Sequence, residues 1–202
     1  MVTRWLSAIC VVLGCVVATG ALAQAPMRQH LTIDHPGKLD PAQANEIYDD
    51  IAAELADMYA LSQEPATHGY QRWVRHNIAP YLSATHGNRY INNFANRLAA
   101  DYAKVAGGDG RLPPGAVIAK DSFTVTAEGE VFGAALFIME KLAAGASPAT
   151  ADWRYAMILP DGSYDADSQG DTPESAAYCH HCHKAKAKAD YLFFVPRAYR
   201  RE

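Results

Sequence analysis

The chain has little charge and few cysteines. Of its 202 residues 20% are charged and 50% are hydrophobic, which is the composition of a domain that buries a core rather than of a disordered segment. Its 18 lysines and arginines do not exceed its 22 aspartates and glutamates. This balance argues against nucleic-acid binding, which depends on clustered positive charge. Only four cysteines are present, and their positions decide what they can do.

The first two cysteines, Cys10 and Cys15, lie in residues 1–23, which we predict to be a secretory signal peptide. A basic residue precedes an apolar run, and small residues follow it up to Ala23, where we expect cleavage. A transmembrane anchor is the alternative, but the run is shorter than the roughly 20 apolar residues that a spanning helix needs. A lipoprotein acylated at Cys15 is disfavoured by Leu13. We therefore expect a periplasmic protein that keeps two cysteines and does not span the membrane.

Helices are expected in residues 40–110, after a lead-in segment, residues 24–39, that lacks periodicity. Asp40 can cap a helix, Pro41 suits its first position, and Gln43 completes a capping box. The apolar residues that then recur at three-to-four spacing and predict one buried face are Ile47, Ile51, Leu55, Met58 and Tyr59.

Two further helices are predicted in this part of the chain. One begins near Tyr70 and ends before Pro80. The other covers about residues 88–105, because apolar residues share one face while Asn92 and other polar residues point elsewhere. The apolar residues of that face are Ile91, Phe94, Leu98 and Tyr102.

The character of the chain changes in residues 111–202, where we predict a small antiparallel β-sheet. Short apolar or alternating runs, separated by Gly, Pro or Asp-Gly turns, are typical of strands. These runs are residues 116–125, 131–141, 152–159 and 191–195. Residues 176–189 are rich in Ala, Lys and His and favour a short helical segment. The predicted fold is α+β, with N-terminal helices followed by the sheet, and residues 40–202 form one domain.

The last two cysteines lie in a Cys-x-x-Cys-His motif formed by Cys179, His180, His181, Cys182 and His183. This spacing is typical of c-type haem attachment, in which the thiols form thioethers with the haem and the histidine ligates the iron. A disulfide would not explain the histidine that follows, and a zinc site normally has four ligands at family spacing. We therefore predict a C-terminal haem c held covalently by Cys179 and Cys182, with His183 as the metal ligand.

The sixth position of the haem iron is expected to be open. Small electron-transfer cytochromes carry the motif near the amino end and take a downstream Met ligand, but no Met follows His183. Four-helix cytochromes c′ carry it near the carboxyl end, and the strand-like runs argue against that fold. Lys184, Lys186 and Lys188 then alternate with alanines. Such a run is most often a solvated face, and the alternatives are steering of an acidic redox partner or pairing with haem propionates.

Several segments together resemble the cytochrome P-460 family, which includes hydroxylamine-oxidising members and the gas-binding cytochromes c′-β. Only the haem motif is specific alone, so the order and spacing of the segments carry the resemblance. They are residues 86–96 (HGNRYINNFAN), 114–123 (PGAVIAKDSF), 137–141 (FIMEK), 152–155 (DWRY) and the haem motif with residues 190–194 (DYLFF).

The resemblance implies a β-rich, usually dimeric fold, a five-coordinate haem with His183 as proximal ligand, and a distal pocket for small nitrogen species or gases. In the hydroxylamine-oxidising members a Lys is bonded to a meso carbon of the porphyrin, and Lys120 matches it here. A Lys in an apolar sheet has a lowered pKa and a nucleophilic neutral amine. Alternatively its ammonium pairs with Asp121, with a propionate or with solvent. Strand alternation would place Ile118, Lys120 and Ser122 on one side and Asp121 on the other.

The remaining site residues are less sharply defined by the sequence. Glu140 and Asp121 are the candidates for a distal proton acceptor, which hydroxylamine oxidation requires. Candidates for the pocket wall are Phe137, Met139, Tyr155 and Met157, and candidates for propionate binding are Arg89, Arg154 and Arg197. His86 either caps a helix or approaches the haem.

Three functions follow from these residues. The first is an oxidoreductase that oxidises hydroxylamine or a related nitrogen compound at a Lys-modified haem and passes electrons to another cytochrome. The second is a binding protein of the cytochrome c′-β kind that captures nitric oxide or carbon monoxide. The third is a simple electron carrier. The first function requires a covalent bond between Lys120 and the haem, and the other two do not.

Overall fold

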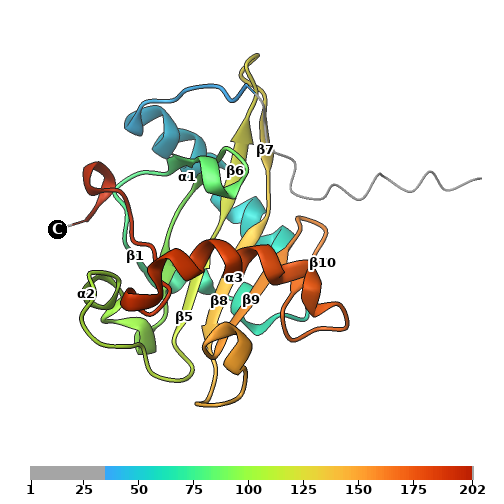
Figure 1. Cartoon of the computed structure of the whole chain (residues 1–202). Helices are drawn as coiled ribbons and strands as arrows, with labels where there is room; N and C mark the ends of the chain where they lie inside the picture. The colour runs from blue at the N-terminus through green and yellow to red at the C-terminus, as the bar shows by residue number, and fades with distance from the viewer. Residues whose placement is uncertain (1–34, 202) are drawn as a thin grey trace, which may run out of the picture.

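The computed structural model describes residues 35–201, and the predicted signal peptide lies outside this range. The fold is mostly β and contains two antiparallel sheets (Figure 1). The six-stranded sheet has the order β1 (Val74–Arg75), β4 (Phe94–Ala95), β5 (Val117–Lys120), β8 (Leu136–Lys141), β9 (Trp153–Ile158) and β10 (Tyr164–Asp167). The four-stranded sheet has the order β2 (Tyr81–Ser83), β3 (Arg89–Ile91), β6 (Ser122–Val125) and β7 (Val131–Gly133).

Helix α1 (Pro41–Tyr59) begins where the sequence predicts. The Asp40 side chain accepts hydrogen bonds from the backbone N–H of Ala42 and of Gln43, each at 2.9 Å, and Gln43 Oε1 accepts one from the Asp40 N–H at 3.0 Å. The capping box is therefore confirmed. The predicted apolar face is confirmed too: Leu55 and Tyr59 are buried, and the other three residues pack partly buried against the same cluster.

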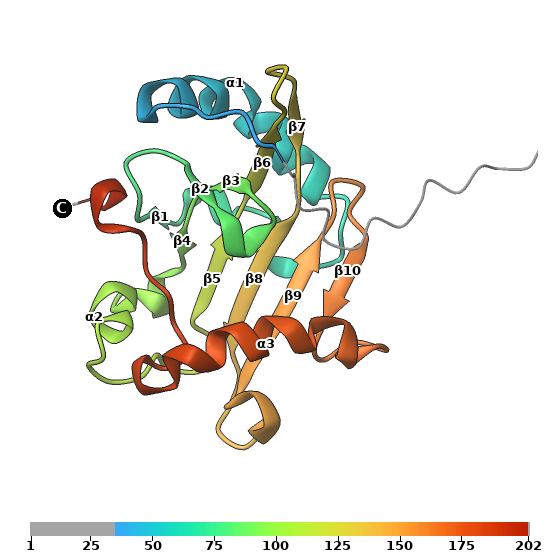
Figure 2. The ribbon, with the colours of Figure 1, turned by 45° about the horizontal axis from the view of Figure 1, so that its top comes forward.

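The two faces of the six-stranded sheet are covered by different helices. Tyr48 and Leu55 of α1 share one core cluster with Ala119 and Ile138. On the other face the core includes Tyr102 and Val105 of α2 (Tyr102–Ala106), and α3 (Ala177–His183) crosses β5, β8 and β9 there (Figure 2). Short 3-10 turns connect the elements: Pro65–Thr67, Tyr70–Arg72, Ala84–His86, Arg97–Ala99, Pro148–Thr150, Pro173–Ala176, Lys184–Ala189 and Arg197–Tyr199.

The predicted helix over residues 88–105 is wrong. The segment contains β3, β4, a 3-10 turn and only the short helix α2. Asn92 and Asn93 are buried rather than solvent-facing: Asn92 Nδ2 donates to Asp121 Oδ1 at 2.9 Å, and the Asn93 N–H donates to Asn77 Oδ1 at 2.8 Å. These tertiary hydrogen bonds hold the backbone extended and override the apolar periodicity.

Two other predicted elements also differ from the structure. The helix expected from Tyr70 is a single 3-10 turn followed by β1, so α1 is the only long helix of the predicted N-terminal set in residues 35–201. The strand predicted over residues 191–195 does not form. Asp190 and Tyr191 have φ angles of 51° and 64°, and two consecutive left-handed residues turn the chain away from sheet pairing. The remaining predicted strands are present as β5 to β9. The sequence missed β10 and also β1 to β4, which lie in the part that was expected to be helical.

Within residues 35–201, no helix combines the length and the apolar character that crossing a bilayer requires.

Candidate functional site

Helix α3 carries the Cys-x-x-Cys-His motif, which confirms the predicted helical segment. Cys179, Cys182 and His183 are three and four residues apart, so they lie on the same face of the helix. All three line a cavity of about 330 Å³ on the side of the sheet that α3 covers. Both cysteines are free thiols, and residues 35–201 contain no group of three or more His, Cys, Asp or Glu arranged to hold a metal ion. The disulfide and zinc alternatives therefore gain no support.

The imidazole of His183 is oriented by a backbone carbonyl. Its Nδ1 lies 2.7 Å from the Tyr191 carbonyl oxygen, and since a carbonyl only accepts, Nδ1 carries the proton and donates. Burial, together with the nearby Lys120 charge, lowers the pKa of His183 to about 4, so the ring is neutral near pH 7. The Nε2 lone pair is then available for a metal, and a second-shell carbonyl of this kind is typical of metal-bound histidines.

Lys120 lies at the end of β5 and lines the same cavity. It is only 5% exposed, and no hydrogen bond or ion pair to its side-chain amine is found in residues 35–201. Burial lowers its pKa to about 8, so a large share of the amine is neutral near that pH. Ile118 lines the cavity with it, as strand alternation predicts.

Asp121 faces the opposite side of the sheet from Lys120. It is completely buried and accepts hydrogen bonds from Tyr48 Oη at 2.7 Å, from Tyr70 Oη at 3.0 Å and from Asn92 Nδ2 at 2.9 Å. Burial raises its pKa, and these hydrogen bonds oppose the rise. Asp121 therefore neither lines the cavity nor pairs with Lys120, and it anchors α1 to the sheets.

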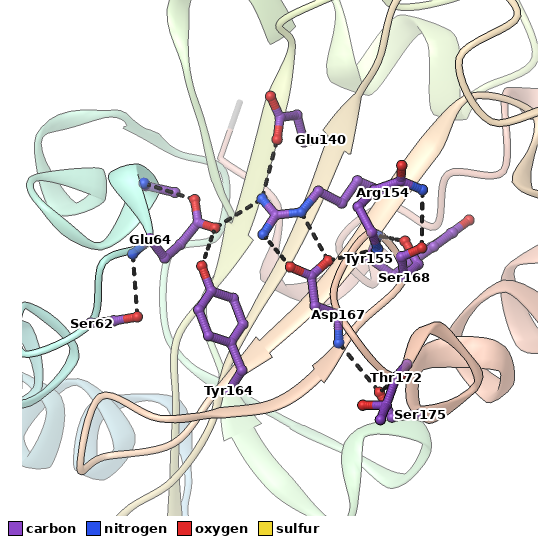
Figure 3. A network of polar contacts seen from close by, with 12 residues as sticks. Ser62, Glu64, Glu140, Arg154, Tyr155, Tyr164, Asp167, Ser168, Thr172 and Ser175 are labelled. Carbon is purple, nitrogen blue, oxygen red and sulfur yellow. Dashed lines mark hydrogen bonds and ion pairs between the residues drawn. The ribbon is translucent and has the colours of Figure 1, made fainter.

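Glu140 also lies outside the cavity, in the polar cluster of Figure 3. There Arg154 forms ion pairs with Glu64 at 2.8 Å, with Asp167 at 2.7 Å and with Glu140 at 3.3 Å. Tyr164 Oη adds a hydrogen bond to Glu64 at 3.1 Å. Neither Arg154 nor Glu140, which the sequence suggested for propionate binding and for proton transfer, lines the cavity.

The cavity wall is largely apolar and aromatic. Phe137, Met139 and Tyr155 line it as predicted, whereas Met157 is buried in the neighbouring core. His86 also lines it: its Nδ1 is hydrogen-bonded to Ser83 Oγ at 2.8 Å. Among the described residues no Asp or Glu lines the cavity.

Several wall residues were missed by the sequence reasoning. Phe193, Phe194, Tyr178 and Tyr81 all line the cavity, and the aromatic run after the motif is the signal that could have identified the first two. Of the arginines, Arg89 is buried beside the Phe137 ring, with its guanidinium carbon 5.8 Å from the ring centroid, and Arg197 is exposed; neither lines the cavity.

The residues present fit a haem. Two thiols and a neutral imidazole converge on one apolar-walled cavity, which is the donor set of c-type haem attachment. The buried hydroxyl of Tyr155, which lines the cavity, has no hydrogen-bond partner in residues 35–201. A polar edge of a bound group would satisfy such atoms, since buried polar groups are normally hydrogen-bonded.

The motif and its cavity define the class of c-type haem proteins. The comparison with protein families agrees: Cytochrome P460 matches residues 67–194. The chain therefore belongs to the cytochrome P460 family, as its resemblance to that family suggested, and the family implies a haem c cofactor. No curated protein matches the chain.

Proposed function

We propose that this chain is a periplasmic monohaem cytochrome with an open distal position that performs redox chemistry on small nitrogen compounds such as hydroxylamine or nitric oxide. The observation that carries the proposal is the position of Lys120. Its buried amine, which has no partner in residues 35–201, shares one cavity with Cys179, Cys182 and His183. In the proposal the two thiols would hold the haem, His183 would ligate its iron, and Lys120 would be the residue bonded to the porphyrin. That bond would replace one N–H of the amine and one C–H of the ring, so its formation would release two electrons and two protons to an external oxidant.

The bound haem would supply a one-electron redox centre, and the chain supplies its surroundings. The Tyr191 carbonyl fixes the His183 ring at 2.7 Å. The aromatic walls exclude water, which strengthens electrostatic interactions in the cavity. Burial lowers the pKa of Lys120 to about 8, which raises the fraction of neutral amine that bond formation to carbon requires.

A proton acceptor is needed if the substrate is hydroxylamine, because its oxidation removes protons along with electrons. Asp121 and Glu140 lie outside the cavity and are not retained for this role. We assign it to His86, which lines the cavity and whose Nδ1 is held by Ser83. An imidazole can accept and release a proton through a ring nitrogen, which is what this role needs.

A gas-binding function is the second candidate, and the cavity lining favours it. No carboxylate lines the cavity in residues 35–201, and the walls are mostly apolar, as expected for capture of an uncharged diatomic gas. In this alternative Lys120 stays unmodified.

The deciding experiment is the absorption spectrum of the matured, reduced protein with and without carbon monoxide. A Lys120 crosslink should shift the ferrous band to the red, and proteolysis should give a haem peptide that joins the Lys120 peptide to residues 179–183. Lys120→Leu should restore an ordinary spectrum, whereas Lys104→Leu, a change at an exposed lysine, should not. An ordinary spectrum for the unmodified sequence would remove the crosslink and leave gas binding.

Carbon monoxide tests the open position. Met139 is the one methionine among the described residues that lines the cavity, so it is the thioether that could occupy the sixth position. Binding of carbon monoxide to the reduced protein supports an open site. Binding that appears only after Met139→Leu would instead support a six-coordinate electron carrier.

Covalent attachment has its own test. Cys182→Ser should abolish covalent haem staining after denaturing electrophoresis, and retained staining would contradict the central assignment.

A further inference from the structure

The segment that follows the haem motif projects as a basic turn. Lys184, Lys186 and Lys188 lie in the 3-10 turn Lys184–Ala189, and every residue from 184 to 188 is exposed. We call these three lysines the basic turn. None of the ion pairs found in residues 35–201 includes any of them. In a chain with a net charge of −4, they form a local positive field of opposite sign to the whole.

One aromatic side chain connects this turn to the proposed iron ligand. The Phe193 ring meets the His183 ring edge to face, with centroids 5.3 Å apart and an interplanar angle of 88°. Lys186 Nζ lies 5.3 Å from the centroid of the same Phe193 ring. Phe193 lines the cavity and is also 37% exposed. Through Phe193, these two contacts therefore connect His183 in the cavity with Lys186 at the surface.

We propose that the basic turn and the exposed part of Phe193 form the docking surface for an acidic protein that accepts one electron. This inference rests on the proposed function, because it requires a reducible haem in the cavity. Carboxylates of the partner face the basic turn, and its redox centre approaches Phe193. The oxidised partner gains one electron, the ferrous iron is left ferric, and no proton or bond changes hands.

The charge of this surface favours an acidic partner protein over a second copy of the chain. A second copy of the chain would bring its own basic turn, and like charges repel. The apolar contact is small, since Phe193 is only partly exposed and the residues between the lysines are alanines. Such a surface suits a short-lived complex steered by charge, as is typical of redox encounters.

The experiment uses the haem-loaded, reduced protein in stopped flow. The probes are an oxidised acidic blue-copper protein and a basic mitochondrial cytochrome c. At about 10 mM ionic strength, where charges act over roughly 30 Å, the triple variant K184Q/K186Q/K188Q should reduce the acidic probe about tenfold more slowly. The difference should disappear in high salt, and the basic probe should react no more slowly with the variant than with the unmodified protein.

A matched control separates this surface from net charge. The variant K38Q/R72Q/R97Q removes three positive charges from exposed residues on other elements. It should react with the acidic probe faster than the triple lysine variant at low salt. Equal rates for the two variants would overturn the proposal.

Two further measurements separate docking from electron transfer. The affinity of the oxidised protein for the copper-free acidic probe, measured by calorimetry, should fall in K184Q/K186Q/K188Q, and an unchanged affinity would contradict the docking surface. Phe193→Leu should keep that affinity and slow the transfer at saturating probe. A rate unaffected by Phe193→Leu would remove the aromatic contact from the proposal. Failure of the proposed function is distinct, because the protein would then show no reducible haem band before mixing.

Discussion

Replacing Arg154 by Leu is expected to be among the most destabilising single changes in the polar interior. The Arg154 side chain is 13% exposed and pairs with Glu64, which is 4% exposed, and with Asp167, which is 15% exposed. Its third partner, Glu140, is 34% exposed and can turn to solvent. The substitution therefore leaves one fully buried and one largely buried carboxylate without a cation.

The size of the expected loss of stability depends on the hydrogen bonds that the two carboxylates keep after the substitution. Glu64 retains hydrogen bonds from the Ala66 N–H at 3.1 Å and from Tyr164 Oη at 3.1 Å, and Asp167 retains one from the Gln169 N–H at 2.9 Å. Breaking a buried pair by removing one partner costs about 3–5 kcal/mol, and these hydrogen bonds favour the lower end. We expect the free energy of unfolding to fall by about 3 kcal/mol, which corresponds to a fall in melting temperature of roughly 6–12 °C for a protein of this size.

Urea unfolding of the haem-loaded protein, followed by far-ultraviolet circular dichroism, measures this loss. The double variant E64L/R154L should recover part of it, because the buried carboxylate is removed with its cation. Lys104→Leu is the control: its pair with Asp109 spans 3.4 Å between side chains that are 61% and 75% exposed, so stability should hardly change. A loss for R154L as small as that of the control, or no recovery in the double variant, would refute the reasoning.

Three other changes test the core and the site. Leu55→Ala should cost about 2–5 kcal/mol in urea unfolding because Leu55 is 1% exposed, whereas Leu61→Ala, at a 67% exposed side chain, should cost little; equal losses would contradict the assigned face of α1. Burial raises the pKa of Asp121 above 3.8, so the folded protein binds this proton more tightly than the unfolded chain, and stability falls as pH rises from 3.8. Asp121→Asn should weaken that part of the pH dependence of the free energy of unfolding. An unchanged pH profile would argue against a raised pKa for Asp121. Lys141→Met breaks the buried 2.8 Å pair with Asp190 and should lower the free energy of unfolding by about 3 kcal/mol, with partial recovery when Asp190→Asn is added; a loss near zero would show that the pair is not desolvated.

The sequence predicted well those features that depend on local chemistry. The start of α1 was predictable because Asp40, Pro41 and Gln43 form a cap that needs no other part of the chain. The side of Lys120 was predictable because strand alternation is a local property, and the helical segment with Cys179 followed from composition and motif spacing.

The features that depend on distant partners could not be predicted. Residues 88–105 have helical periodicity, yet Asn92 is held by Asp121 and Asn93 by Asn77, contacts that no local pattern encodes. The position of Glu140 depends on Arg154, which lies on the neighbouring strand. His86 lines the cavity because a turn between β2 and β3 brings it there, so its side chain could not be assigned from the chain alone.

A single residue, Asp121, connects β5 to β6, and this limits the insertions and deletions that the chain can accept. Lys120 faces the cavity and Asp121 the buried tyrosines on the opposite side. Adding or deleting one residue within β5 would exchange the two, placing a carboxylate in the cavity and an amine among Tyr48 and Tyr70. Changes in chain length should therefore be excluded from β5 and tolerated in surface turns such as residues 143–150, so relatives can lengthen the rim of the molecule but not this strand.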